Sequence, residues 1–125
     1  MPYFQRFPFA RVGASSPLYD FVPPIKRLAR KDNVVTMTTF SKWGDTHRGV
    51  RAKTGKCPHL VLVGVATDCC VSSTAISAAE AGAFVTVVVD ACAGSSTKNQ
   101  SAATAILEGY EPLIRTVSHR EFLRG

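Results

Sequence analysis

The sequence predicts an α/β fold in which helices cover both faces of a mostly parallel sheet, a three-layer, Rossmann-like arrangement. Residues 60–63 and 84–89 are apolar runs of strand length, the second interrupted only by Thr86, a pattern typical of parallel strands that are buried on both faces. Between them, residues 70–81 carry small apolar side chains at helical spacing, and Gly82 is a natural helix end. Strand, turn, helix and strand in this order and length form one βαβ unit.

The segments outside this unit are shorter and less regular. Residues 1–17 contain Pro2, Pro8 and Pro17 and are expected to form an irregular arm, followed by a domain at residues 18–125. Before the central unit, the patterns predict a short helix within residues 18–30 that has Pro23 and Pro24 near its start. They also predict a strand at residues 34–37 and a weak helix at residues 46–53. After the central unit, they predict a helix, a strand and a helical turn at residues 98–108, 113–117 and 119–123. The residues expected to face inward from the first of these are Ala102, Ala105 and Ile106.

Composition limits the class of protein. A chain of 125 residues allows one domain, and no apolar run approaches the roughly 18 residues of a membrane-spanning helix. The net charge of +6 is uneven, because residues 1–57 carry +8 and residues 58–125 carry −2. No nucleic-acid motif accompanies the basic part, so we expect a solvated basic surface and neither a nucleic-acid nor a membrane partner. Without a secretory signal, the expected location is cytoplasmic.

The cysteines do not form a pattern for a disulfide framework or a metal site. Their spacing, at Cys57, Cys69, Cys70 and Cys92, matches no zinc motif, and no cofactor or metal is expected. Cys69 and Cys92 are most simply small buried apolar residues.

Cys70 has the position that suits a nucleophile. It follows a predicted strand and begins a predicted helix, which is where open α/β sheets bind ligands. The positive end of the helix dipole favours a thiolate there, and free backbone amides can hold a developing oxyanion. The competing interpretation is a structural, buried cysteine.

A longer motif surrounds Cys70. Residues 64–71 read Gly-Val-Ala-Thr-Asp-Cys-Cys-Val, and Ser-Thr-Ala follows at 73–75. This motif closely resembles the nucleophile motif of isochorismatase-like cysteine hydrolases, which include nicotinamidases and N-carbamoylsarcosine amidases. The resemblance implies that Cys70 is the nucleophile, that the backbone amides of Ala66 and Cys70 form the oxyanion hole, and that the Val65–Ala66 peptide bond is cis. It extends over about residues 18–123.

Two departures from the family pattern weaken the expected activity. Met37 occupies the position of the family's catalytic lysine; Lys42 is a weak candidate to replace it, and a surface lysine is the simpler interpretation. The family's first strand, which ends in an aspartate that acts as general base, has no counterpart, and Asp20 does not receive that role. The resemblance therefore implies a family member whose N-terminal strands are missing.

Two functions follow from these observations. The preferred one is a cysteine hydrolase that cleaves the C–N bond of a small amide through Cys70, impaired by the missing aspartate and lysine. The alternative is an inactive, truncated member that serves as a binding or assembly module or is a remnant. The candidate pocket residues are Thr67, Phe40 and Trp43. A homo-oligomer is possible.

A nucleotide-binding unit is a weaker third interpretation. No G-x-G-x-x-G motif follows a strand, and Asp68 would repel a phosphate at this turn. We expect Asp68 to cap the helix that begins near Cys70, with Thr67 as the other candidate.

Overall fold

The structure is a computed structural model that describes residues 2–8, 13, 15–44, 49–54 and 58–125. The chain divides into two compact units, Met1–Val34 and Val35–Gly125, each described by itself. The sequence-based division after residue 17 stays a prediction.

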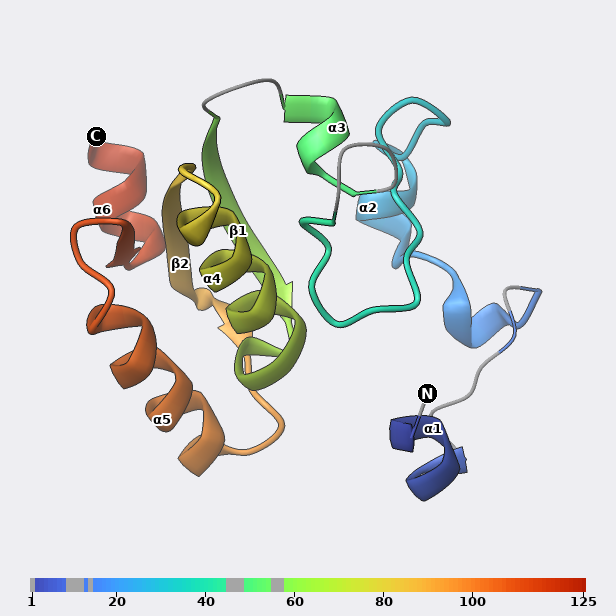
Figure 1. Ribbon diagram of the computed structural model, residues 1–125. Helices are drawn as coiled ribbons and strands as arrows, with labels where there is room; N and C mark the ends of the chain where they lie inside the picture. Colours follow the sequence, from blue (N-terminus) through green and yellow to red (C-terminus); the bar gives the residue numbers. More distant parts are fainter. Residues whose placement is uncertain (1, 9–12, 14, 45–48, 55–57) are drawn as a thin grey trace. The chain divides into compact units, whose positions relative to one another are not determined.

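The first unit contains short helices (Figure 1): α1 at Pro2–Arg6, a 3₁₀ turn η2 at Pro17–Tyr19 and α2 at Pro23–Lys26. The prediction of an irregular arm is wrong at α1, because proline at a first helical position begins a helix without losing a hydrogen bond. The short helix predicted within residues 18–30 corresponds to α2, which begins at Pro23 as predicted and ends after one turn. No residue of α2 is buried, so no packing extends it beyond one turn.

The second unit contains a parallel sheet of three strands. These are β1 at His59–Val65, β2 at Phe84–Ala93 and β3 at Ile114–Val117, in the order β1-β2-β3. The predicted parallel α/β fold is confirmed. Strand β2 continues past Asp90, its predicted end, because a register shift lets Gly64 and Val65 pair with Cys92 and Ala93.

The strand predicted at residues 34–37 does not form. These residues have no regular secondary structure, and no described strand pairs with them. Residues 51–53 of the predicted weak helix lie in α3, Arg51–Thr54, while residues 45–48 lie outside the described part of the chain.

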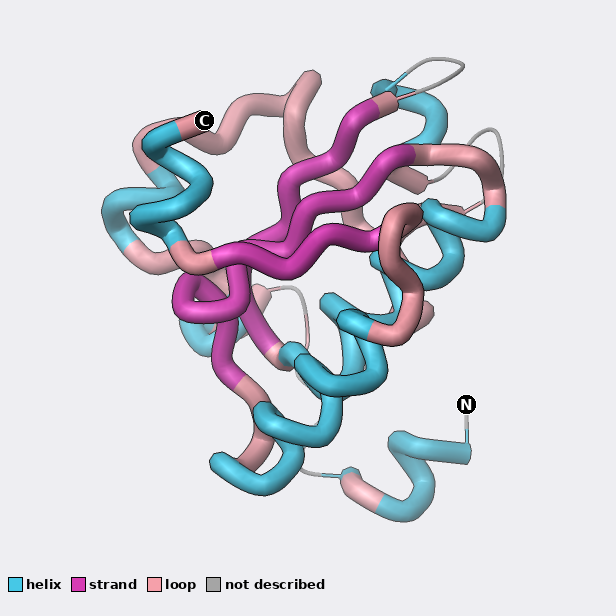
Figure 2. Tube along the Cα trace, turned by 90° about the vertical axis from the view of Figure 1, so that its left-hand side faces the viewer, coloured by secondary structure: helices cyan, strands magenta, loops and turns pink. Residues whose placement is uncertain are grey.

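Helices flank the sheet on both sides (Figure 2). They are α4 at Ser72–Glu80, α5 at Thr97–Glu108 and α6 at His119–Arg124, and a π-turn, η3 at Thr67–Val71, leads into α4. Helix α4 crosses one face of the sheet in front of β1 and β2 (Figure 1). Helix α6 contacts β2 on the other face, so the predicted three-layer order is present.

The apolar core lies between the sheet and helices α4 and α5. Val87 and Ile114 of the sheet and Ala75 and Ala78 of α4 are completely buried. The small alanines let α4 approach the strands closely. From α5 the buried residues are Ala103 and Leu107, whereas Ala102, Ala105 and Ile106 are exposed, so the predicted inward face of this helix is wrong by one residue.

Side chains and glycine define the ends of the later helices. Ser96 caps α5 by accepting a hydrogen bond from the Asn99 amide, and Ser118 and Glu121 form a capping box on α6. Gly82, at φ 92°, follows the end of α4, where a residue with a side chain would be strained.

Among the helices that the structure describes, none combines the length and apolar character needed to cross a bilayer.

Candidate functional site

Cys70 lies on the π-turn that joins β1 to α4. The turn begins after Ala66, whose carbonyl oxygen accepts hydrogen bonds from the amides of Cys69 (3.0 Å) and Val71 (3.1 Å). The Val65–Ala66 peptide bond is cis, at the position where the family resemblance predicts one. Cys70 is half-buried at the C-terminal end of a parallel strand, which is the side of an α/β sheet where ligands bind.

Asp68 does not cap α4. Its carboxylate accepts hydrogen bonds from the Ser95 amide (2.8 Å), the Ser95 hydroxyl and the Asn99 side chain (3.3 Å). These bonds tie the Cys70 turn to the loop between β2 and α5. The hydrogen bonds from Ser95 hold the pKa of Asp68 below its ordinary value, so this tether is ionised at neutral pH.

The expected cap fails because the helix does not begin where the sequence suggests. The first turn is a π-turn, and the N-cap position of α4 falls on Val71, which makes no side-chain cap. Thr67 does not replace Asp68, since its buried hydroxyl has no hydrogen-bond partner among the described residues.

Lys42 is attached to the same end of α4. Its amide donates to the Thr74 hydroxyl (2.9 Å), and that hydroxyl donates to the Cys70 carbonyl (2.7 Å). Its ammonium donates to the carbonyl oxygens of Met37 (2.9 Å) and Thr39. Lys42 is therefore half-buried and fixed, and its ammonium lies against the main chain of the residue where the family resemblance places a lysine.

The pKa values of the other two described thiols are raised. Burial raises the pKa of the Cys69 thiol, the adjacent Cys70 raises it further, and the charge of Lys42 acts in the opposite direction. Burial also raises the pKa of Cys92. Both residues are half-buried, and like Cys70 they are free thiols. Cys57 lies outside the described residues.

The three candidate pocket residues differ in their surroundings. Trp43 is buried in the core with Val71 and Ala75, and its indole N–H has no partner among the described residues. Thr67 is completely buried, and Phe40 is half-buried. Trp43 thus contributes to packing, and a role for any of the three in a pocket stays a prediction.

Sequence reasoning missed the residues that hold the turn in place. Ser95, Asn99 and Thr74 each bond to the turn or to Lys42, but none belongs to a local motif that marks this role. Their contacts with Asp68 or Lys42 span 27 to 32 residues. Asp20 pairs with Lys26 inside the first unit. Among the described side chains, no group of three or more His, Cys, Asp or Glu residues is placed to hold a metal ion.

Comparison with solved structures gives partial likenesses to two hydrolases. An isochorismatase-like hydrolase from Alkaliphilus metalliredigens matches with 23% identity and a TM-score of 0.48, over 53% of this chain and 33% of that one. The nicotinamidase from Staphylococcus aureus matches with 32% identity and a TM-score of 0.44, over 49% of this chain and 37% of that one. The matched part thus spans about a third of each protein.

A comparison with curated proteins found no match. Among protein families, the model of the isochorismatase domain matches residues 1–119, which is nearly the whole chain. The chain belongs to the isochorismatase family.

Proposed function

We propose that this chain is a cysteine hydrolase that cleaves the C–N bond of a small amide, with Cys70 as its nucleophile. The observation that carries the proposal is the position of Cys70 on the turn after β1, with the fixed Lys42 beside the same end of α4. Membership of the isochorismatase family supports a hydrolytic activity.

The reaction has two steps. The Cys70 sulfur attacks the carbonyl carbon of the amide, and the C–N bond breaks after the nitrogen takes up a proton, so that an amine or ammonia leaves and a thioester remains. Water then attacks the thioester, the C–S bond breaks, and a carboxylic acid is released while the thiol regains its proton. The backbone amides of Ala66 and Cys70 are the proposed donors to the oxyanion in both steps.

Lys42 is the proposed source of positive charge in the site. Its charge opposes the rise in the pKa of Cys69, so the ammonium acts on the neighbouring thiol electrostatically. Because Met37 carries no charge, Lys42 takes over part of the role that the family resemblance assigns to that position. No general base equivalent to the family's aspartate is proposed, and we expect slow turnover, since loss of such a base typically costs ~10²- to 10⁴-fold in rate.

The first experiment measures the alkylation of each cysteine by iodoacetamide against pH, in the native protein and in urea, with the labels located by mass spectrometry. We expect native Cys70 to react faster than the other thiols and to lose this preference in urea. Lys42→Gln should slow the reaction of Cys70. Lys53→Gln, which removes an exposed lysine of α3, should not.

Turnover is then measured with a panel of small primary amides and carbamoyl compounds. Cys70→Ala should abolish any hydrolysis, whereas Cys69→Ala, the matched control one residue away, should retain it. If Cys70 is protected from alkylation and no amide is cleaved, the proposal fails, and the alternative of an inactive binding or assembly module replaces it. A homo-oligomer and a cytoplasmic location stay predictions.

A further inference from the structure

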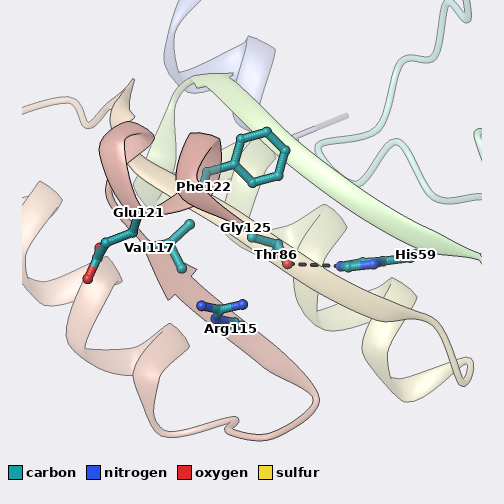
Figure 3. A pocket seen from close by; sticks show the side chains of 7 residues that line it. All are labelled: His59, Thr86, Arg115, Val117, Glu121, Phe122 and Gly125. Atoms are coloured by element: carbon teal, nitrogen blue, oxygen red, sulfur yellow. Dashed lines mark hydrogen bonds between the residues drawn. The ribbon is translucent and has the colours of Figure 1, made fainter.

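A cavity of about 200 Å³ lies beside α6, on the face of the sheet that α4 and α5 do not cover (Figure 3). Its position follows from strand alternation, because Thr86 and Arg115 are register partners that point away from the buried Val85 and Val87. It is therefore separate from the turn that carries Cys70.

The cavity contains a cation that makes no ion pair. Arg115 pairs with no carboxylate among the residues that the structure describes, although its charge helps to lower the pKa of Glu121. The carboxylate of the nearby Glu121 accepts hydrogen bonds from the amide (2.7 Å) and the hydroxyl (2.8 Å) of Ser118. Figure 3 shows this carboxylate on the side of the group away from His59. The guanidinium of Arg115 thus keeps its planar set of donors for a ligand.

Polar groups beside Arg115 extend the recognition surface. The His59 ring nitrogen Nε2 and the Thr86 hydroxyl lie 3.0 Å apart and share a hydrogen bond (Figure 3). Thr86 is almost completely buried and forms part of the cavity floor, whereas His59 lies at its edge on β1. The shared bond fixes the ring of His59 beside the cavity.

Two apolar side chains line the rest of the cavity, together with Glu121 and Gly125. Val117 is buried in the floor, and the ring of Phe122, which is 44% exposed, stands at the opposite side of the cavity from Arg115 (Figure 3). A cavity of ~150 Å³ can hold one benzene molecule, so this one is large enough for a benzene ring with a single substituent. Its shape therefore suits a molecule with one apolar end and one charged end.

We propose that this cavity binds a small organic monocarboxylate of about the size of benzoate. The carboxylate would pair with the guanidinium of Arg115, in the two-pronged geometry that arginine favours, and the apolar body would lie against Val117 and Phe122. This site goes beyond the proposed hydrolase activity and does not depend on it, because it shares no residue with the Cys70 turn.

The test is a titration of the full chain with benzoate, followed by ¹H–¹⁵N NMR. We expect shifts at Thr86, Val117 and Phe122 but not at Cys70, with a Kd of about 1 mM, since the ligand is small and only partly enclosed. Arg115→Gln should weaken binding about tenfold or more, because it removes a charge-assisted hydrogen bond. Arg120→Gln, the matched loss of an exposed arginine on α6 that does not line the cavity, should leave Kd unchanged.

Two other ligands and a second variant provide further tests of the proposal. Benzyl alcohol, which lacks the charge, and sulfate, which lacks the apolar body, should each bind at least several-fold more weakly than benzoate. Equal binding of either one would overturn the proposal.

If Arg115→Gln unfolds the chain, a second variant, Arg115→Lys, keeps the positive charge but loses the planar pair of donors. It should weaken binding several-fold. An unchanged Kd in that variant would also overturn the proposal. Shifts centred on Cys70 would assign the benzoate to the catalytic site instead.

Discussion

The two faces of the sheet are built from the same strands, but only one of them is fully covered. On the face under α4 and α5, Val87 and Ile114 are completely buried. On the other face, Val61 and Val63 of β1 are 43% and 59% exposed, and Phe84 is 59% exposed. Strand alternation therefore places apolar side chains on both faces, while the helices determine which of them contribute to stability.

On the second face of the sheet, side chains of β2 near α6 are buried, whereas those of β1 are exposed. Helix α6 has six residues, and Val88 and Val117 on this face are nearly buried. Strand β1 forms the end of the sheet, and its apolar side chains on this face stay accessible. Adjacent exposed apolar side chains of this kind are typical of binding or association surfaces, which is consistent with the cavity beside α6.

The same valine-to-alanine substitution on each face tests this contrast, and we expect it to have the largest effect on the free energy of unfolding. Val87→Ala on the covered face should lower the free energy of unfolding by about 2 to 3 kcal/mol, because it removes two buried carbons and leaves a cavity. Val63→Ala on the open face should change it by no more than about 0.5 kcal/mol. Chemical denaturation measures both. Equal losses would show that the open face is buried in solution.

The central βαβ unit could be predicted from the sequence because its signals are local. The apolar runs that became β1 and β2 have strand length, and Gly82 ends α4 where a positive φ is needed. The helical period of α5 was also visible in the sequence. Its phase was not, since Ala103 and Leu107 face the core only because of where α5 meets the sheet.

The features that the sequence did not predict depend on distant partners. Residues 34–37 have the β-branched composition of a strand, but a strand needs a neighbour, and no described strand pairs with them. Asp68 has a residue type and position that suit a helix cap, yet it bonds to Ser95, 27 residues away. In the candidate site, the resemblance indicated Cys70, whereas the contacts of Lys42 with Thr74 and Met37 required the structure.

The covered face can also be disturbed from outside the sheet. A β-carbon at Gly49 would lie 1.9 Å from the carbonyl oxygen of Trp43, a residue of the core on that face. Gly49→Ala should therefore displace Trp43 and cost about 2 kcal/mol of stability. Gly13→Ala, where a β-carbon meets no atom within 4 Å, is the control and should be nearly neutral. Trp43 fluorescence reports the displacement directly, and an unchanged spectrum in Gly49→Ala would contradict this account.

The partly covered region under α6 should behave as an intermediate case. Val117 lies on the open face but is only 6% exposed, because α6 covers it. Val117→Ala should lower the free energy of unfolding by about 1 kcal/mol, since α6 is short and can settle into the space. Denaturation curves should place it between Val87→Ala and Val63→Ala. A loss as large as that of Val87→Ala would mean that both faces contribute equally.

The smallest expected effect concerns the attachment of α6 at low pH. The Asp90 carboxylate accepts from the His119 amide (2.7 Å) and pairs with the His119 ring (2.6 Å), and this pairing holds the pKa of Asp90 below its ordinary value. A depressed folded-state pKa contributes stability above the unfolded value of ~3.9, and that contribution is lost as the pH falls through the folded value. Acid should therefore loosen α6 below about pH 4.

NMR signals of α6 and of the core distinguish local loosening from general unfolding. Glu121 in the capping box of α6 also has a pKa below its ordinary value, because of hydrogen bonds from Ser118, so Asp90→Asn should reduce the acid response of α6 without removing it. Asp68→Asn, which removes the carboxylate at the Cys70 turn, should leave that response unchanged. If the signals of Phe122 and Val87 instead disappear together at one pH, α6 and the core unfold as a single unit. In that case, α6 does not loosen before the rest of the domain.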